Sequence, residues 1–169
     1  PAKVRPGLIK LQQLNRGALA EMRTLLMELR PATLLNTRLR VLLEQLTSAV
    51  LGRIPVTMRT HLDEIPPLPP DVHIALYRVA QEALNNIIRH AEASKVDVTM
   101  RALESGVEIT IEDNGQGFDP SAVTPEHQGL QIMRERAERV GIALDISSVP
   151  GQGTRIHALW HGQFASEVV

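Results

Sequence analysis

Apolar residues recur with two different spacings along the chain. At 7–30 and at 36–51 they return every three or four positions, which predicts two amphipathic helices. Pro31 ends the first of these helices, and Gly52 is the expected C-cap of the second. At 54–62 apolar and polar residues alternate instead, which predicts a β-strand. Two helices therefore precede the first strand.

The remainder of the chain mixes helices and strands. After a rigid proline-rich connector at 65–70, Asp71 is the expected N-cap of a long helix that runs to about His90. The later elements are predicted as strands at 96–103 and 107–112 joined by "ESG", a polar loop at 113–127, a helix at 128–140 ended by Gly141, and strands at 142–149 and 154–161 joined by "PGQG". This order favours the α+β class. We expect a two-layer α/β sandwich, with helices on one face of a mixed, mostly antiparallel sheet, preceded by an N-terminal helix.

Composition narrows the possible functions. Of the 169 residues, 43% are hydrophobic and 2% aromatic, which is typical of a soluble domain with an aliphatic core. The formal net charge of −1 gives no electrostatic reason to expect nucleic acid as a partner, and the lack of cysteine excludes disulfides and thiolate metal sites. No run reaches the roughly 20 apolar residues of a membrane span. We expect a cytoplasmic domain and, because the chain begins at Pro1, a fragment whose parent can be membrane-anchored.

Four polar residues of the long helix share one face at α-helical spacing: Glu82, Asn86, Arg89 and His90. A carboxylate can act as an acid, a base or a water-positioning group, and an amide oxygen can bind a hard cation. The positively charged side chain of Arg89, which follows them, can pair with a phosphate. A solvated helix face explains the pattern about equally well on this helix alone, but the set is also typical of a site for a magnesium nucleotide.

The strand at 107–112 ends on a carboxylate that continues its apolar face. Asp113 has the same parity as Val107, Ile109 and Ile111, so its side chain is expected to point inward and to need hydrogen-bond donors. An exocyclic amine such as that of adenine is one donor, and the following Gly-x-Gly lets a flat ring approach the backbone. A solvated β-turn is the alternative for this motif in isolation.

Two later glycine motifs complete the pattern. Gly129 lies at a predicted helix N-terminus, whose free N–H groups can receive phosphate. The turn at 150–154 has two glycines before Thr154 and, taken alone, is best explained as a hairpin. Each motif is weak by itself, whereas the four in this order are specific.

This order resembles the four nucleotide-binding motifs of the GHKL superfamily, which has the Bergerat ATP-binding fold. The segments "RVAQEALNNIIRHAEASKV", "DNGQGF", "GLQIMRERAERVG" and "PGQGT" are similar to those of sensor histidine kinases that pair with LuxR/NarL-type response regulators. The leading "ALAEMRTLLMELRP" is similar to the second helix of their dimerisation and phosphotransfer region. The resemblance implies a dimerisation segment at 1–31, an ATP-binding catalytic domain at 32–162 and a disordered tail at 163–169.

The resemblance also implies roles for individual residues. Asn86 would coordinate Mg2+, and Glu82 would take the acid/base or water-orienting position. Asp113 would accept the adenine amino group, assisted by Gly117 and, through a water, by Thr154. The other implied ATP contacts are Arg89 and His90 facing the phosphates, Gly129 and Leu130 at the exit of the lid, and Gly115, Phe118 and Gly153 in the glycine loops.

The chain departs from the family pattern at two places. His127 replaces the first glycine of the usual Gly-x-Gly-Leu at the end of the lid, and the phosphoacceptor motif, a histidine followed by aspartate, is missing. We therefore expect this chain to bind ATP without phosphorylating itself.

The intact protein, a homodimer, would transfer the γ-phosphoryl group of ATP to a histidine of its own dimerisation helix and then to an aspartate of the regulator. An anti-sigma-factor-type serine kinase of the same fold and a non-catalytic nucleotide-binding dimerisation module are the alternatives.

Overall fold

The computed structural model describes residues 34–120 and 128–165. The helix predicted at 7–30, the dimerisation segment at 1–31 and the lid residue His127 lie outside the described residues. None of the helices in the described ranges has the length and apolar character of a membrane-spanning segment.

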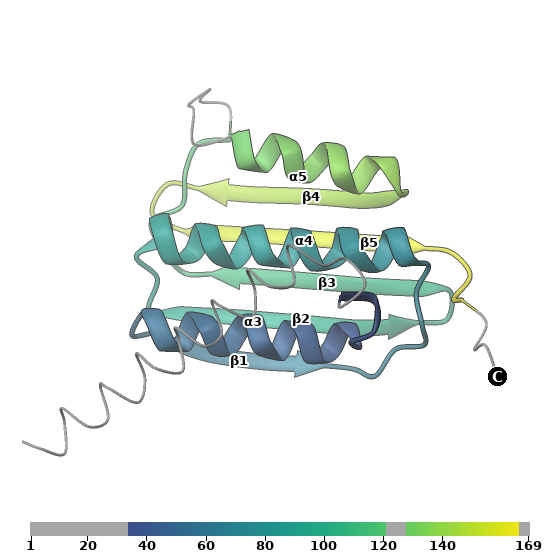
Figure 1. Cartoon of the computed structure of the whole chain (residues 1–169). Helices are drawn as coiled ribbons and strands as arrows, with labels where there is room; N and C mark the ends of the chain where they lie inside the picture. The colour runs from purple at the N-terminus through teal and green to yellow at the C-terminus, as the bar shows by residue number, and fades with distance from the viewer. Residues whose placement is uncertain (1–33, 121–127, 166–169) are drawn as a thin grey trace, which may run out of the picture.

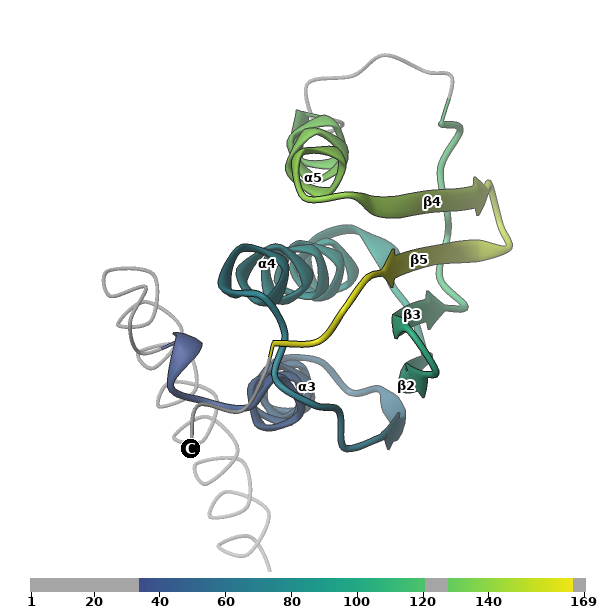
Figure 2. The ribbon, with the colours of Figure 1, turned by 90° about the vertical axis from the view of Figure 1, so that its right-hand side faces the viewer.

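A mixed sheet of five strands forms one layer and the helices form the other, as Figures 1 and 2 show. Its order is β1-β2-β3-β5-β4, with β1 parallel to β2 and the other neighbours antiparallel. The strands are β1 (Thr57–Leu62), β2 (Lys95–Leu103), β3 (Gly106–Asp113), β4 (Ile142–Val149) and β5 (Gly153–His161). The helices are α3 (Leu39–Arg53), α4 (Pro70–Asn86), the π-helix η1 (Ile87–Ala91) and α5 (Gln128–Arg139). The predicted α+β architecture is confirmed.

The core lies between the two layers because alternate strand positions point toward the helices. In β3, Val107, Ile109 and Ile111 are buried, and the residues between them are half-buried on the other face. That other face carries ion pairs such as Arg59 to Asp97 at 2.7 Å and Arg155 to Glu112 at 2.9 Å. The sheet therefore has one apolar and one polar face, as the alternation predicted.

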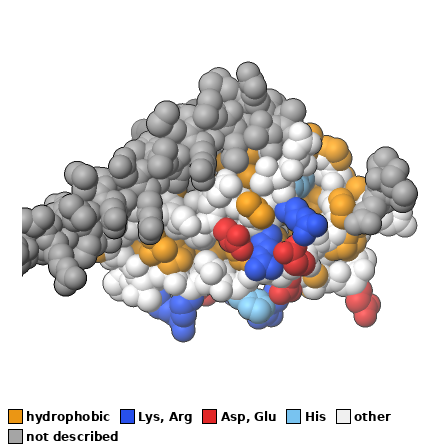
Figure 3. All heavy atoms as spheres, turned by 60° about the horizontal axis from the view of Figure 1, so that its bottom comes forward, with side chains coloured by type: hydrophobic (Ala, Val, Ile, Leu, Met, Phe, Trp, Pro, Cys, Tyr) orange, Lys and Arg blue, Asp and Glu red, His pale blue; other side chains and the backbone are white. Residues whose placement is uncertain are grey.

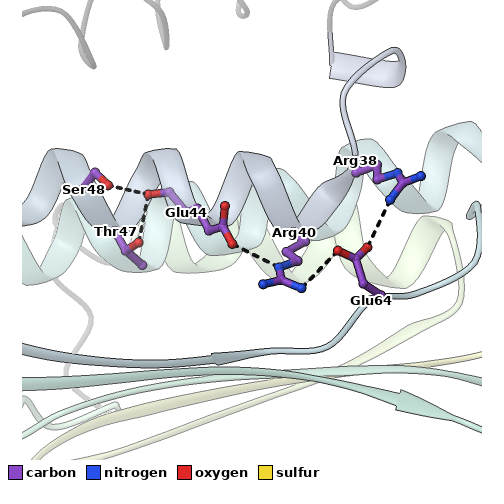
Figure 4. Close-up of polar contacts among 6 residues, drawn as sticks. All are labelled: Arg38, Arg40, Glu44, Thr47, Ser48 and Glu64. Carbon is purple, nitrogen blue, oxygen red and sulfur yellow. Dashed lines mark hydrogen bonds and ion pairs between the residues drawn. The ribbon is translucent and has the colours of Figure 1, made fainter.

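Helix α3 is held mainly by its apolar side. Leu42, Leu43 and Val50 are at most 1% exposed. On its outer side Arg40 pairs with Glu44 and Glu64, each at 3.0 Å, and Figure 4 shows Glu64 bridging to the helix from the loop after β1. Figure 3 shows such opposite charges side by side on this face, not a patch of one sign. Exposed pairs of this kind are screened by water and stabilise little, so the buried leucines decide where α3 docks.

Three predicted boundaries were wrong, each for a local reason. The first strand begins at Thr57 instead of residue 54, since Pro55 has no N–H for the ladder. Gly52 lies inside α3, whose C-cap is Ile54. Asp71 is not the N-cap of α4, which begins at Pro70 after the N-cap Pro69. Proline suits the first helical position because the N–H that it lacks would have had no partner there.

The end of the chain also differs from the expected tail. Phe164 packs edge-on against Trp160 with ring centroids 6.0 Å apart, and the Ala165 N–H donates to the Pro67 carbonyl at 2.8 Å. Phe164 and Ala165 thus lie against the domain, whereas 166–169 are outside the described ranges.

One buried histidine should make the fold sensitive to acid. His73 on α4 is 8% exposed, its Nε2 has no hydrogen-bond partner among the described residues, and burial lowers its pKa from the ordinary 6.5. The bond to the Leu34 carbonyl acts in the opposite direction and is the smaller effect. The unfolded chain then binds a proton more readily than the folded chain, so stability is complete above pH 6.5 and falls below it.

Replacing this histidine should flatten the pH dependence. His73→Asn keeps a side-chain N–H but cannot protonate, so its free energy of unfolding should fall less between about pH 7 and pH 5.5 than that of the wild type, by up to ~1.4 kcal/mol per pH unit. Urea denaturation at several pH values measures this, with exposed His61→Asn as the control. Equal slopes for His73→Asn and the wild type would contradict the prediction.

Candidate nucleotide site

A cavity of about 290 Å3 opens between the end of the long helix and the adjoining ends of β3 and β5. Its walls include apolar side chains from both layers, namely Ala83, Ile87, Ile111 and Ile156. Seven residues predicted to bind the nucleotide line it: Asn86, His90, Asp113, Gly117, Phe118, Leu130 and Thr154. The structure therefore brings together motifs from four separate parts of the chain.

Asp113 is the buried polar group of this cavity, at 9% exposed. Its predicted inward direction is confirmed, because it follows the buried positions of β3 without a break. Its Oδ1 accepts the Gly115 N–H at 2.8 Å, and the Thr154 N–H also donates to the carboxylate. Burial raises the pKa of the Asp113 carboxyl, while the two backbone bonds lower it and so favour the charged form.

The glycine loops pack closely on one another, with no room for side chains. A Cβ at Gly115 would lie 2.1 Å from the Ala91 carbonyl oxygen, and one at Gly117 would lie 2.1 Å from the Val149 carbonyl oxygen. At Gly153 it would lie 1.9 Å from the carbonyl oxygen of Asp113. These glycines let the backbones of the loops meet, which places the donors around Asp113.

Gln116, between the two glycines of the first loop, ties this loop to its neighbours. Its N–H donates to the Ala91 carbonyl at 2.7 Å, its side-chain amide donates to the His90 carbonyl, and its own carbonyl accepts the Gly151 N–H at 2.6 Å. Gln116 thus links the end of η1 to the turn before β5. No sequence pattern pointed to Gln116, because a glutamine in a polar loop is not distinctive.

The π-helix changes which residues face the cavity. The long helix extends to Ala91, close to the predicted end at about His90, but its last turn, Ile87–Ala91, is a π-helix and not the α-helix that the shared face assumed, and its C-cap is Glu92 with φ of 51°. A π turn holds more residues than an α turn, so side chains within the π-helix, Arg89 and His90 among them, are rotated from their α-helical positions relative to Asn86. Asn86 and His90 line the cavity, whereas Arg89 is exposed and lies outside its lining. The shared face predicted for all four polar residues is therefore split.

Glu82 lies beside the cavity and not in its lining. It lines a neighbouring groove of about 170 Å3 between α4 and α5, together with Arg78, Gly129 and Arg136. A Cβ at Gly129 would be 2.3 Å from Oε1 of Glu82, so the carboxylate lies directly against the start of α5. This contact joins two of the predicted motifs.

Ser148 is a second buried polar residue at the site that the sequence analysis missed. It is 8% exposed at the end of β4, and its Oγ lies 2.9 Å from both the Phe118 N and the Thr154 Oγ1. A signal for it exists in the sequence: Ser148 continues the inward parity of Ile142 and Ile146 as Asp113 continues that of β3.

The donor set fits a purine nucleotide with its metal. The apolar walls can hold a flat ring, the buried carboxylate can accept from an amino group, and the Asn86 amide can offer an oxygen to a hard cation. Within the described ranges there is no cluster of three or more histidine or acidic side chains that could hold a metal. Mg2+ usually completes its coordination with water and phosphate oxygens, so a single amide is compatible with it.

Comparisons with known proteins agree on one family. Residues 71–162 match the family model of histidine kinase-, DNA gyrase B- and HSP90-like ATPases. The chain is 36% identical over 136 residues to the sensor histidine kinase LiaS of Bacillus subtilis, covering 80% of this chain and 38% of LiaS. It is 32% identical over 146 residues to the sensor protein VraS of Staphylococcus saprophyticus, covering 86% of this chain and 42% of VraS. It thus spans about two fifths of the length of these relatives.

A solved structure shares the fold at low sequence identity. The blue-light activated histidine kinase of Erythrobacter litoralis superposes with a TM-score of 0.64 at 18% identity, covering 90% of this chain and 57% of that one.

The two glycines of the turn between β4 and β5 should differ in their tolerance of alanine. Gly151 and Gly153 both have positive φ, at 79° and 83°, but a Cβ at Gly151 meets no atom of the described residues within 4 Å. Gly151→Ala should cost only the strain of its left-handed backbone, about 1 kcal/mol of unfolding free energy. Gly153→Ala adds a clash with the Asp113 backbone and should cost about 3 kcal/mol or more. Denaturant unfolding compares the pair, and equal costs would contradict the close approach.

Proposed function

The chain belongs to the histidine kinase-, DNA gyrase B- and HSP90-like ATPase family, and we propose how its residues bind the nucleotide. Within this family it is the ATP-binding catalytic domain of a two-component sensor histidine kinase. The observation that carries the proposal is the buried Asp113 carboxylate, held by two backbone donors at the end of an apolar cavity. A carboxylate in such a place can accept from a neutral amino group at little further desolvation cost.

The adenine ring lies in the apolar part of the cavity in this proposal. Its exocyclic amine donates to Asp113, and its faces contact Ile87 and Ile156, which line the walls. Gly117 and Thr154 border the same end of the cavity and complete the contacts to the base. With few aromatic residues in the chain, aliphatic contact replaces ring stacking.

The phosphates extend toward the start of α5. Asn86 supplies an amide oxygen to Mg2+, which neutralises phosphate charge when bound. His90 and the backbone N–H groups at the start of α5, near Gly129 and Leu130, face the phosphate oxygens. Arg89 is less suitable than the sequence implied, because it is exposed outside the cavity lining.

Glu82 acts at the reacting end in this proposal. Its contact with Gly129 supports this assignment, because the carboxylate lies in the α4–α5 groove against the start of α5, the end of the site proposed for the phosphates. We assign it to orienting the phosphoacceptor instead of removing a proton in full, because phosphoryl transfer depends mainly on positioning and charge stabilisation.

The reaction of the longer protein follows from this site. The bond between the β–γ bridging oxygen and the γ-phosphorus breaks, a histidine ring nitrogen on the protein's own dimerisation helix takes the phosphoryl group, and ADP leaves. The phosphoryl group then passes to an aspartate of a response regulator, for which we propose the LuxR/NarL type. The longer protein acts as a homodimer, and its parent chain can be membrane-anchored. The remaining three fifths of the length of the curated relatives leaves room for the helix and a sensor.

Removing the charge of Asp113 should abolish nucleotide binding and leave the fold intact. Asp113→Asn presents an amide N–H toward the amino group, so the affinity for Mg-ADP should fall by about 100-fold or more in calorimetry. Because the pKa of Asp113 is raised, the folded chain loses stability as pH rises through that pKa and the carboxyl becomes charged. Asp113→Asn removes this charge, so it should not lower the melting temperature at neutral pH. Asp145→Asn, which removes an exposed charge on β4, is the matched control. Unchanged Mg-ADP affinity in Asp113→Asn would overturn the adenine assignment.

The phosphorylated product should distinguish the proposed reaction from the alternatives. A protein extended at its N-terminus by the missing helix should incorporate γ-phosphate from labelled ATP into a product that is labile in acid and stable in base, as a phosphohistidine is. The 169-residue chain alone should incorporate none. An acid-stable product would point to a serine kinase of the same fold, and binding without any incorporation would point to a non-catalytic nucleotide module.

A further inference from the structure

The inward side chains at the ends of three neighbouring strands form a polar row. Asp113 on β3 pairs with Thr154 on β5, and Thr154 pairs with Ser148 on β4. The next row inward, Ile111, Ile156 and Ile146, is apolar. Two members of the polar row line the nucleotide cavity, whereas Ser148 lies behind them, 8% exposed. Ser148 can therefore act on a ligand only through its neighbours.

The hydroxyl of Ser148 has three polar neighbours that differ in what they can do. The Phe118 N–H can only donate, and it reaches Oγ at 2.9 Å. The Gly153 carbonyl can only accept, and it lies 3.0 Å from Oγ. The Thr154 hydroxyl, at 2.9 Å, can do either. A serine hydroxyl has one proton and two lone pairs, so the three contacts use it completely.

Counting the protons fixes the direction of each bond. The Phe118 N–H takes one lone pair, and the single proton of Ser148 goes to the Gly153 carbonyl. The second lone pair then accepts the proton of Thr154. The opposite assignment would turn the Ser148 proton to Thr154 and leave the Ser148 Oγ and the Gly153 carbonyl oxygen 3.0 Å apart with no proton between them, so their lone pairs would repel and the Gly153 carbonyl would lose this donor. The Thr154 proton therefore points into the protein, and only its lone pairs face the cavity.

We propose that Ser148 is a positioning residue for nucleotide selection. It holds the Thr154 hydroxyl in an orientation in which Thr154 can only accept a hydrogen bond from a ligand. The neighbouring carboxylate of Asp113 can also only accept. This corner then favours a base whose edge carries an amino group and disfavours one with a carbonyl oxygen at the same position. The inference rests on the proposed function, since it assumes that the base lies at this end of the cavity. It adds a residue that touches no ligand and still sets part of the specificity.

The test compares two nucleotides that differ in the exocyclic group of the base. Calorimetry of the 169-residue chain with Mg-ADP and Mg-IDP gives a ratio of dissociation constants that should favour ADP. In Ser148→Ala the Thr154 hydroxyl can turn and donate, so this preference for ADP should fall by about 10-fold. Ser147→Ala, at the exposed neighbouring position of β4, should leave the ratio within about 2-fold of the wild type. Ser148→Cys, which keeps the shape with weaker bonds, should change the ratio in the same direction even if the alanine variant does not fold.

A second background shows whether Ser148 acts through Thr154. In Thr154→Val, which has no hydroxyl to orient, Ser148→Ala should leave the ratio unchanged, as a double-mutant cycle requires. Equal losses of affinity for ADP and IDP in Ser148→Ala would overturn the proposal by showing a purely structural role. A change of ratio that persists in Thr154→Val would overturn it as well. A wild-type chain that binds neither nucleotide would instead refute the proposed function, so the two failures are distinguishable.

Discussion

One inward-facing row of polar side chains, at the end of an otherwise apolar layer, determines how the site is built. Asp113, Thr154 and Ser148 face the helices, as do the aliphatic rows behind them. Burying a carboxylate there is unfavourable unless donors reach it, and the nearest donors are backbone N–H groups of the adjoining loops. Those loops can come close enough only if side chains are absent, which accounts for glycine at 115 and 153. The buried carboxylate therefore requires these glycines for structural reasons alone, whether or not they contact a ligand.

The same constraint links the two layers. The first glycine loop is joined to η1 through Gln116, which also contacts the turn before β5, and Asn114 accepts the N–H groups of Ser94 and Lys95 at the start of β2. Movement of the loop would therefore disturb the end of the long helix, where Asn86 and His90 line the cavity. The part of the site proposed to bind the base and the part proposed to bind the phosphates are therefore mechanically connected. Rigid elements hold a binding site in position more accurately than a loop alone could.

The sequence predicted most of this fold because its periodicities are strong and local. The alternation in β3 identified Asp113 as inward, and the order of the motifs indicated which segments meet. Boundaries failed where one residue's backbone chemistry overrode the pattern, as at Pro55 and Pro70. The π-helix could not be anticipated, because apolar spacing does not distinguish one additional residue in a turn from the normal irregularity of a helix. Arg89 was therefore grouped with Asn86 on a face that the two do not share.

The omission of Ser148, by contrast, had a remedy in the sequence itself. The argument applied to Asp113, that a polar residue at inward parity at the end of a strand needs a partner, applies equally to Ser148 on β4. A serine at such a position is a weaker indicator of a site than a carboxylate, because burying a serine costs less desolvation energy and serine is common in turns. In the structure, however, this one hydroxyl contacts the first glycine loop, Gly153 at the start of β5, and Thr154. Ser148 is small and neutral, yet its hydroxyl can determine how Thr154 binds. All its hydrogen-bonding positions are occupied, so the Thr154 hydroxyl has only one way to bond to it.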